Sequence, residues 1–251
     1  MLNSQDANQR FFDPYYAAKP RLSLGHRAAR AFRRPFYKAL GSSRQAYRDS
    51  LLTDCHRAHC LELGIGIDNL AIELTQRGAD VTVIDIAPEA INRARECFAR
   101  LALGRHIYAF VQDAESLQFP PGSFDLIYGK WILHHLDTRK VLRELSRCLK
   151  PTGRAVFLEP LGVNPIINLF RRLTPHLRVP GEHPLTDTEL AMFASRFAEV
   201  RVDYHHLLPL PYIPQAFMRR CEQALLCRMP SVGIYAWQAV ITMLRPLKSH
   251  C

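Results

Sequence analysis

The sequence lacks the features typical of membrane-spanning, secreted and repeat proteins. It has no apolar run long enough to cross a bilayer, no secretory signal and no internal repeat. Its seven cysteines include no Cys-x-x-Cys pair, and an odd, scattered set is typical of a reducing compartment. These absences favour a cytoplasmic protein with no disulfide framework.

The residue types that bind zinc occur together at one place. Cys55, His56, His59 and Cys60 lie within six residues of one another. The second half of this cluster enters an apolar stretch typical of a strand, so packing explains the cysteines better than a metal does. We predict no metal site.

Positive charge is concentrated near the N-terminus. The net charge is +10, and residues 1–50 hold ten lysines and arginines but only three aspartates. The solvated face of a covering helix is the preferred explanation, and contact with an anionic molecule, a membrane surface or nucleic acid stays open. The aromatic run at 11–16 argues against a cleaved targeting leader.

From residue 58 onward, short apolar runs alternate with amphipathic ones, which predicts strand–helix units around a buried parallel sheet. We expect one domain over 1–251, with an N-terminal helical part (1–50), a core (51–160) and later segments that line a pocket (161–251). The expected strands are 60–63, 81–86, 107–111, 124–128, 154–158, 200–205 and 235–244. The expected helices are 69–76, 88–101, 138–149, 188–197 and 215–226, with a turn at 150–153 and a Pro- and Arg-rich stretch at 161–184.

The turn after the first expected strand carries Gly64 and Gly66, which let the backbone approach a ligand closely. A dinucleotide fingerprint would need a third glycine where Asn69 stands, so a nicotinamide cofactor is disfavoured. Asp68 is placed to cap the following helix. The turn therefore predicts a ligand site of another kind.

Two carboxylates follow the next two strands. Asp85 ends the second strand, where a carboxylate can accept hydrogen bonds from vicinal ribose hydroxyls. Asp113 follows the third strand, where an adenine amino group would lie. Either acid alone would be a loop or capping residue, but both in order beside a glycine turn indicate a nucleoside at this edge.

These motifs resemble those of the class I S-adenosylmethionine-dependent methyltransferases. The similarity covers about residues 58–160 and rests on Glu62–Gly66, Val83–Ile86, Gln112–Glu115 and Phe124–Ile127. It implies a three-layer Rossmann-like α/β fold whose seven-stranded sheet is mostly parallel with an antiparallel last strand. It also implies S-adenosylmethionine as the cofactor and a lid formed by residues 1–50, with Tyr15 or Tyr16 and Arg44 near the methionine carboxylate. Asp68 departs from the family, which usually has a third glycine there.

The resemblance assigns cofactor binding to Glu62, Gly64, Gly66, Asp85, Ile86, Asp113, Ala114, Gly129 and Tyr16. His134 and His135 follow the fourth strand, where a similarly placed histidine is the base in some relatives. Each of them is also compatible with a packing or solvent role. Other candidates near the acceptor are Glu159, Asn164, His183, His205 and His206.

The leading interpretation is methyl transfer to O, N or C of a small molecule, with a secondary metabolite or a lipid-like acceptor as examples. Nucleic-acid methylation is disfavoured, because the position of the usual Asn/Asp-Pro-Pro-aromatic loop reads Tyr128-Gly129-Lys130-Trp131. Protein arginine methylation would need two glutamates there. A non-catalytic cofactor-binding protein at a lipid surface remains an alternative, suggested by the basic 27–38 stretch and the apolar 230–244 tail. The sequence leaves the oligomeric state open.

Overall fold

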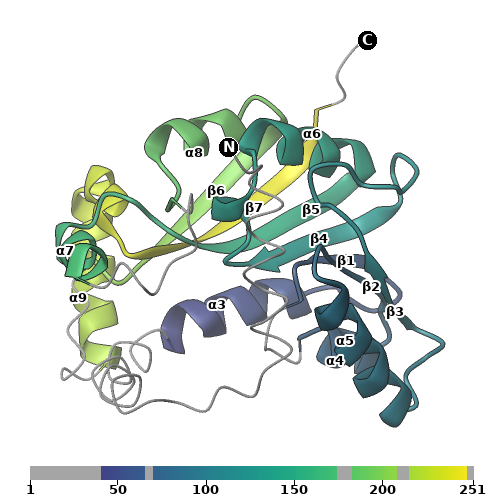
Figure 1. Cartoon of the computed structure of the whole chain (residues 1–251). Helices are drawn as coiled ribbons and strands as arrows, with labels where there is room; N and C mark the ends of the chain where they lie inside the picture. The colour runs from purple at the N-terminus through teal and green to yellow at the C-terminus, as the bar shows by residue number, and fades with distance from the viewer. Residues whose placement is uncertain (1–40, 66–69, 174–182, 208–214, 248–251) are drawn as a thin grey trace.

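The computed structural model describes residues 41–65, 70–173, 183–207 and 215–247. They form one seven-stranded sheet with the order β3-β2-β1-β4-β5-β7-β6, flanked by helices on both faces (Figure 1). The strands are β1 His59–Leu63, β2 Asp80–Asp85, β3 Ile107–Val111, β4 Phe124–Lys130, β5 Leu149–Pro160, β6 Phe197–His205 and β7 Gln238–Pro246. The predicted Rossmann-like architecture is confirmed.

The pairing directions are those expected for this fold. β3, β2, β1, β4 and β5 pair in parallel, whereas β7 runs antiparallel to both of its neighbours, β5 and β6. The carboxyl ends of β1 to β5 therefore meet at one edge of the sheet, which is where open α/β sheets bind ligands.

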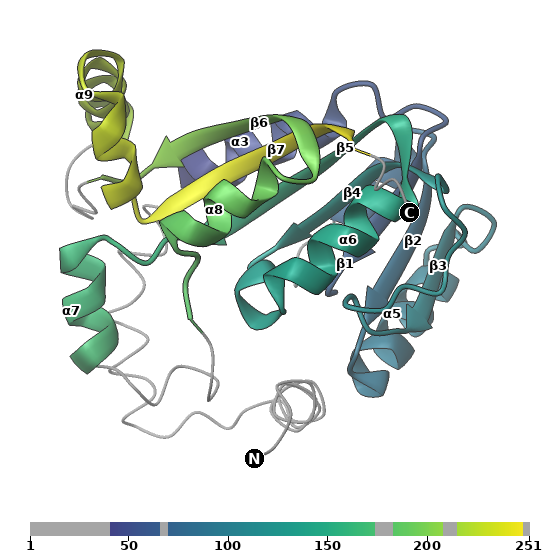
Figure 2. The ribbon, with the colours of Figure 1, turned by 90° about the horizontal axis from the view of Figure 1, so that it is seen from above.

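The helices form two layers. They are α3 Gly41–Leu52, α4 Leu70–Gln76, α5 Pro88–Arg100, α6 Thr138–Cys148, α7 Pro165–Leu173, α8 Asp187–Phe193 and α9 Gln215–Arg228, with short 3-10 turns η1 Leu133–His135 and η3 Pro230–Tyr235. Figure 2 shows α6 and α8 on one face of the sheet; α3, α4 and α5 cover the other, and α7 and α9 lie at one end. None of the helices within the described ranges is long and apolar enough to cross a membrane.

Strand residues alternate between the two layers, as the pleat requires. Leu61 and Phe157 pack in the cluster that contains α6 and α8. Cys60 and Val156 pack in the cluster that contains α3, α4 and α5. Both faces are apolar, so these strands read as continuous hydrophobic runs.

The N-terminal part of the described chain belongs to this second layer. Ser43, Tyr47 and Leu51 of α3 are buried, and the helix packs against β5 and β7. Residues 1–40 lie outside the described residues, so the lid over 1–50 stays a prediction.

Several predicted boundaries were wrong. The turn expected at 150–153 is an irregularity inside β5, because Phe124 pairs with Leu149 but Leu126 pairs with Arg154. The helix expected at 188–197 ends at Phe193, and Phe197 instead starts β6, where its side chain is buried. The strand expected from 235 begins at Gln238.

The Pro- and Arg-rich stretch at 161–184, for which no helix was predicted, contains α7. That helix begins at Pro165, and proline is favoured at the first position of a helix because its missing N–H would be unpaired there. Farther along, a capping box starts α8: the Thr186 hydroxyl accepts from Glu189 N, and the Glu189 carboxylate accepts from Thr186 N.

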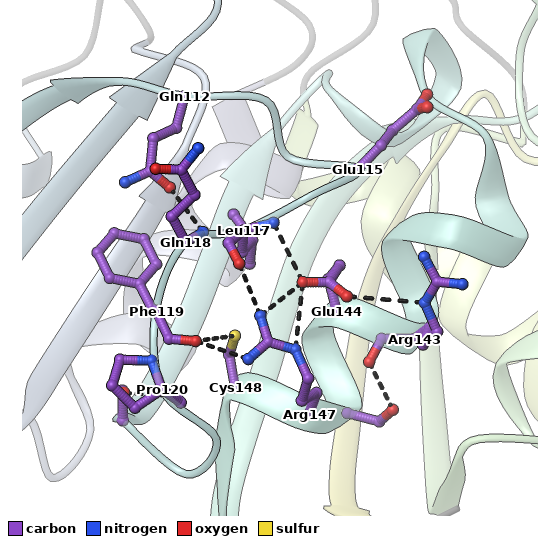
Figure 3. A network of polar contacts seen from close by, with 12 residues as sticks. Gln112, Glu115, Leu117, Gln118, Phe119, Pro120, Arg143, Glu144, Arg147 and Cys148 are labelled. Carbon is purple, nitrogen blue, oxygen red and sulfur yellow. Dashed lines mark hydrogen bonds and ion pairs between the residues drawn. The ribbon is translucent and has the colours of Figure 1, made fainter.

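The connection between β3 and β4 is held by side chains of α6 (Figure 3). The Arg147 guanidinium donates to the carbonyls of Leu117 and Phe119 at 2.7 and 2.6 Å, and to Glu144 at 2.6 Å. Glu144, itself buried, also accepts from Leu117 N at 3.1 Å. These bonds pair backbone groups of a segment that lacks regular secondary structure.

We expect Arg147→Met to lower the free energy of unfolding by about 1–3 kcal/mol, because it removes charge-assisted hydrogen bonds and keeps the aliphatic stem. Arg143→Met is the matched control, since Arg143 contacts the same Glu144 carboxylate at 3.6 Å from a largely exposed position and such pairs contribute little. Urea denaturation measures both. Equal effects of the two substitutions would contradict this account of the loop.

Candidate functional site

The end of β1 is brought close to the end of β4. Gly64 has φ +72°, a left-handed conformation that favours glycine, and its N–H donates to Ile84 O at 2.8 Å. A Cβ at Gly129 would lie 2.7 Å from the Ile132 side chain and 3.0 Å from Leu63 O. The two glycines therefore let the ends of β1 and β4 pack closely against each other and against Ile132. Gly66, Asp68 and Asn69 lie outside the described residues.

Asp85 connects the Gly64 turn to the segment after β2 through two hydrogen bonds. Its Oδ2 accepts from Ile65 N at 2.9 Å and its Oδ1 accepts from Ala87 N at 2.8 Å. Each carboxylate oxygen has a second lone pair, so the side chain can hold the turn and still accept from hydroxyl groups. Ile86, the other residue expected here, is half-buried beside it.

Asp113 and Ala114 follow β3 at the same edge. Asp113 Oδ1 accepts from Glu115 N at 2.9 Å, and burial raises the pKa of the Asp113 carboxyl. Ala114 is buried. Glu115 extends the anchoring, because it accepts from Asp137 N at 2.8 Å and pairs with Lys140 at 3.0 Å.

A buried acid and two cations lie behind the glycine turn. Burial raises the pKa of Glu62 to about 8, although Tyr128 OH donates to it at 3.3 Å. Burial lowers the pKa of Lys130 to about 8, and the nearby Arg44 guanidinium lowers it further. The Arg44 guanidinium and the Lys130 ammonium lie 5.4 and 5.1 Å from the Trp131 ring centroid.

This cluster is suited to an anion. The Nε of Arg44 is buried and has no hydrogen-bond partner within the described residues. Trp131 has φ +56°, a conformation that is costly for a bulky side chain and that is typical of ligand sites. The predicted position of Arg44 near a ligand carboxylate fits these groups, whereas Tyr15 and Tyr16 lie outside the described residues.

His134 and Glu159 form a buried dyad. The Glu159 side chain is 0% exposed, and its Oε1 accepts from Ile132 N and Leu133 N, both at 2.8 Å. Its Oε2 lies 2.7 Å from Nδ1 of His134. A carboxylate that receives three donors holds the imidazole with the proton on Nδ1, so Nε2 is the nitrogen able to accept a proton.

His135 has a different environment. Burial lowers the pKa of His135 to about 3, and the nearby His134 and His183 lower it further. Its ring lies 4.1 Å from that of His134, centroid to centroid. His135 is therefore neutral near pH 7, with a pKa too far below neutrality for an efficient base.

Other residues considered from the sequence hold the scaffold. The buried Asn164 donates to the carbonyls of Leu207 and Tyr235 and accepts from Ile167 N. Nε2 of His206 lies 3.2 Å from the Ser43 hydroxyl, and burial lowers the pKa of His206 to about 4. His205 is half-buried beside it, and His183 is exposed.

The four residues of the cysteine–histidine cluster at 55–60 differ in their exposure to solvent. Cys55 and Cys60 are buried in the core, whereas His56 and His59 are exposed. No group of three or more histidine, cysteine or acidic side chains in the described part of the chain has a metal-binding arrangement.

Three features of the site were not assigned from the sequence. They are the hydrogen bonds that Glu159 accepts, the contacts of the Arg44 and Lys130 cations with the Trp131 ring, and the packing of Ile132 against Gly64 and Gly129. An acid at the end of the apolar run 154–158 was the available signal for Glu159. A buried acid at a strand end must find donors, so its burial alone would have indicated a network.

Comparison with known proteins finds similarity to methyltransferases over part of the chain. A model of the methyltransferase domain family matches residues 61–157. A sterol 4-C-methyltransferase of Caenorhabditis elegans is 28% identical over 107 residues, which are 42% of this chain and 32% of that protein. A ubiquinone biosynthesis O-methyltransferase of Pseudomonas aeruginosa is 35% identical over 113 residues, 44% of this chain and 47% of that protein. The chain thus spans only about a third to a half of the length of these relatives.

Solved structures share the fold over more of the chain. Geranyl diphosphate C-methyltransferase from Streptomyces coelicolor A3(2) superposes with a TM-score of 0.67 at 15% identity, covering 97% of this chain and 98% of that one. The [4+2]-cyclase SpnF gives a TM-score of 0.59 at 19% identity, with 81% and 80% covered. These matches show that residues 61–157, which carry the Gly64 turn, Asp85 and Asp113, are similar to a methyltransferase domain, and that the fold is shared with solved methyltransferases.

Proposed function

We propose that this protein transfers a methyl group from S-adenosylmethionine to a small-molecule acceptor. The observation that carries the proposal is the convergence of the Gly64 turn, Asp85 and Asp113 at one sheet edge, with Asp85 bonded to the turn itself. Because the cyclase SpnF shares the fold, methyl transfer is argued from these residues and from His134 rather than from the fold.

The residues present fit this cofactor. Asp85 would accept from the ribose hydroxyls, and Asp113 with Ala114 would bind the adenine. The methionine part would lie beside the Gly64 turn, and the Arg44 and Lys130 cations would bind its carboxylate. Glu62 lies behind that end of the site.

His134 is the proposed base. S-adenosylmethionine supplies a methyl group on a sulfonium, which is already a good leaving group. The protein therefore has to align the acceptor and, for a hydroxyl, remove its proton. Nε2 of His134 would accept that proton, while Glu159 holds the ring and stabilises the imidazolium. His135 would line the pocket in its neutral form.

The acceptor class is proposed from chemistry and from the relatives. A sterol methyltransferase and a ubiquinone biosynthesis O-methyltransferase support a small, apolar acceptor. The last residues of β4 and the residue after it read Gly129-Lys130-Trp131, which lack the Pro-Pro-aromatic residues that would hold a flipped base. Incubation with methyl-labelled cofactor and separate small-molecule, lipid and RNA pools tests the class. Label appearing only in RNA, or in no pool, would contradict the proposal.

We expect Asp85→Ala to weaken S-adenosylmethionine binding by about 10- to 150-fold, equivalent to about 1.5–3 kcal/mol for lost charge-assisted hydrogen bonds. Asp80→Ala is the control, because Asp80 lies at the opposite end of the same strand and pairs with His106. Calorimetry on proteins with native circular dichroism measures the affinities. Unchanged affinity of Asp85→Ala would remove Asp85 from the site.

We expect His134→Gln to lower turnover on a hydroxyl acceptor by about 10²–10⁴-fold and to leave cofactor affinity unchanged. Glu159→Gln should act similarly, because an amide N–H facing Nδ1 would force the proton onto Nε2. His59→Gln, at the far end of β1, should behave as wild type. Full activity of both site variants on a hydroxyl acceptor would exclude the dyad from proton transfer.

A further inference from the structure

Exposed apolar side chains are concentrated at one end of the molecule. Figures 1 and 2 both place α7 and α9 there, at the end away from β3. Their exposed apolar residues, with those of the segment after α9, are Ile166, Leu169, Leu173, Phe217, Leu225, Met229 and Tyr235. We call this the α7–α9 surface. Isolated exposed leucines need no explanation, but a group of this size at one end of the molecule does.

The α7 helix has apolar residues on both of its sides. Ile167 is buried and packs with Trp131 and Trp237. Ile166, Leu169 and Leu173 recur at helical spacing on the outer side, where Leu169 is 59% and Leu173 is 72% exposed. A surface helix ordinarily presents charged and polar residues to water. The outer side of α7 is thus built to meet an apolar phase.

The α9 helix also exposes apolar side chains. Leu226 packs against the core, whereas Phe217 is 61% exposed. Exposed arginines accompany these apolar residues: Arg172 on α7, and Arg219, Arg220 and Arg228 on α9. Glu222 is the one acidic residue of the two helices, and it accepts from His206 N at 3.3 Å. Apolar side chains among arginines with almost no acids are typical of helices that lie in the interface of an anionic bilayer.

We propose that the α7–α9 surface binds an anionic lipid bilayer, with the apolar side chains at the acyl boundary and the arginines at the headgroups. Charge complementarity favours a bilayer over a protein partner, because the cores of protein interfaces are depleted of charge. The inner side of α7 contacts Trp131, which follows Gly129 at the proposed cofactor site. Docking here would bring the proposed site close to the membrane. The binding itself does not depend on the proposed function.

The test is co-sedimentation of the full chain with vesicles of phosphatidylcholine and 30% phosphatidylglycerol, compared with vesicles of phosphatidylcholine alone. Binding should be at least tenfold stronger to the anionic vesicles and should weaken with salt. Leu169→Ser with Leu173→Ser should lower binding at least tenfold. Arg219→Gln with Arg220→Gln should lower it by about fivefold for each charge on anionic vesicles.

Tyr108→Ser with Phe110→Ser is the matched control, because these residues are 48% and 41% exposed on the opposite edge strand β3. Its binding should equal that of the wild type. Absence of wild-type binding, or binding that survives the α7 substitutions, would overturn the proposal. So would a dimer in gel filtration that the α7 substitutions dissociate, because this surface would then be a contact between copies of the chain.

Discussion

The carboxylate of Glu159 is buried at the end of β5, and three donors of the segment after β4 converge on it. A buried charge without such partners would cost several kcal/mol, so the segment has little freedom to adopt another path. Two consequences follow. The contact of His134 Nδ1 with Glu159 holds the imidazole in one orientation, and Ile132 is held against Gly64 and Gly129. The position of the proposed base and the packing at the ends of β1 and β4 therefore depend on one side chain.

The parallel sheet provides the second level of organisation. Pairing of β1 with β2 and β4 in one direction brings the ends of non-consecutive segments to a single edge. Asp85 then fastens two of these ends together through Ile65 N and Ala87 N. Asp113 is held differently, since its loop has no regular structure and is anchored by Glu144 and Arg147 of α6. The nucleoside end of the site is thus supported from the helical layer.

Buried ionisable groups lie at the end of the site near Trp131. Burial shifts the pKa values of Glu62 and Lys130 in opposite directions, each toward its neutral form. With a pKa of about 8 for each, Glu62 is mainly protonated and Lys130 mainly charged near pH 7. Together with Arg44, the cluster carries positive charge next to an apolar ring. An anionic ligand group would stabilise this arrangement, which agrees with a methionine carboxylate.

The sequence by itself determined the strand–helix alternation, the glycine turn and the acids Asp85 and Asp113, because these depend on local periodicity and on the common edge of parallel strands. The tertiary structure alone decided that Asn164 and His206 hold the scaffold while Glu159 bonds His134, since the partners lie far apart in sequence. It also decided that α7 exposes apolar residues, because periodicity identifies an apolar stripe but cannot say which side of a short helix the core will cover.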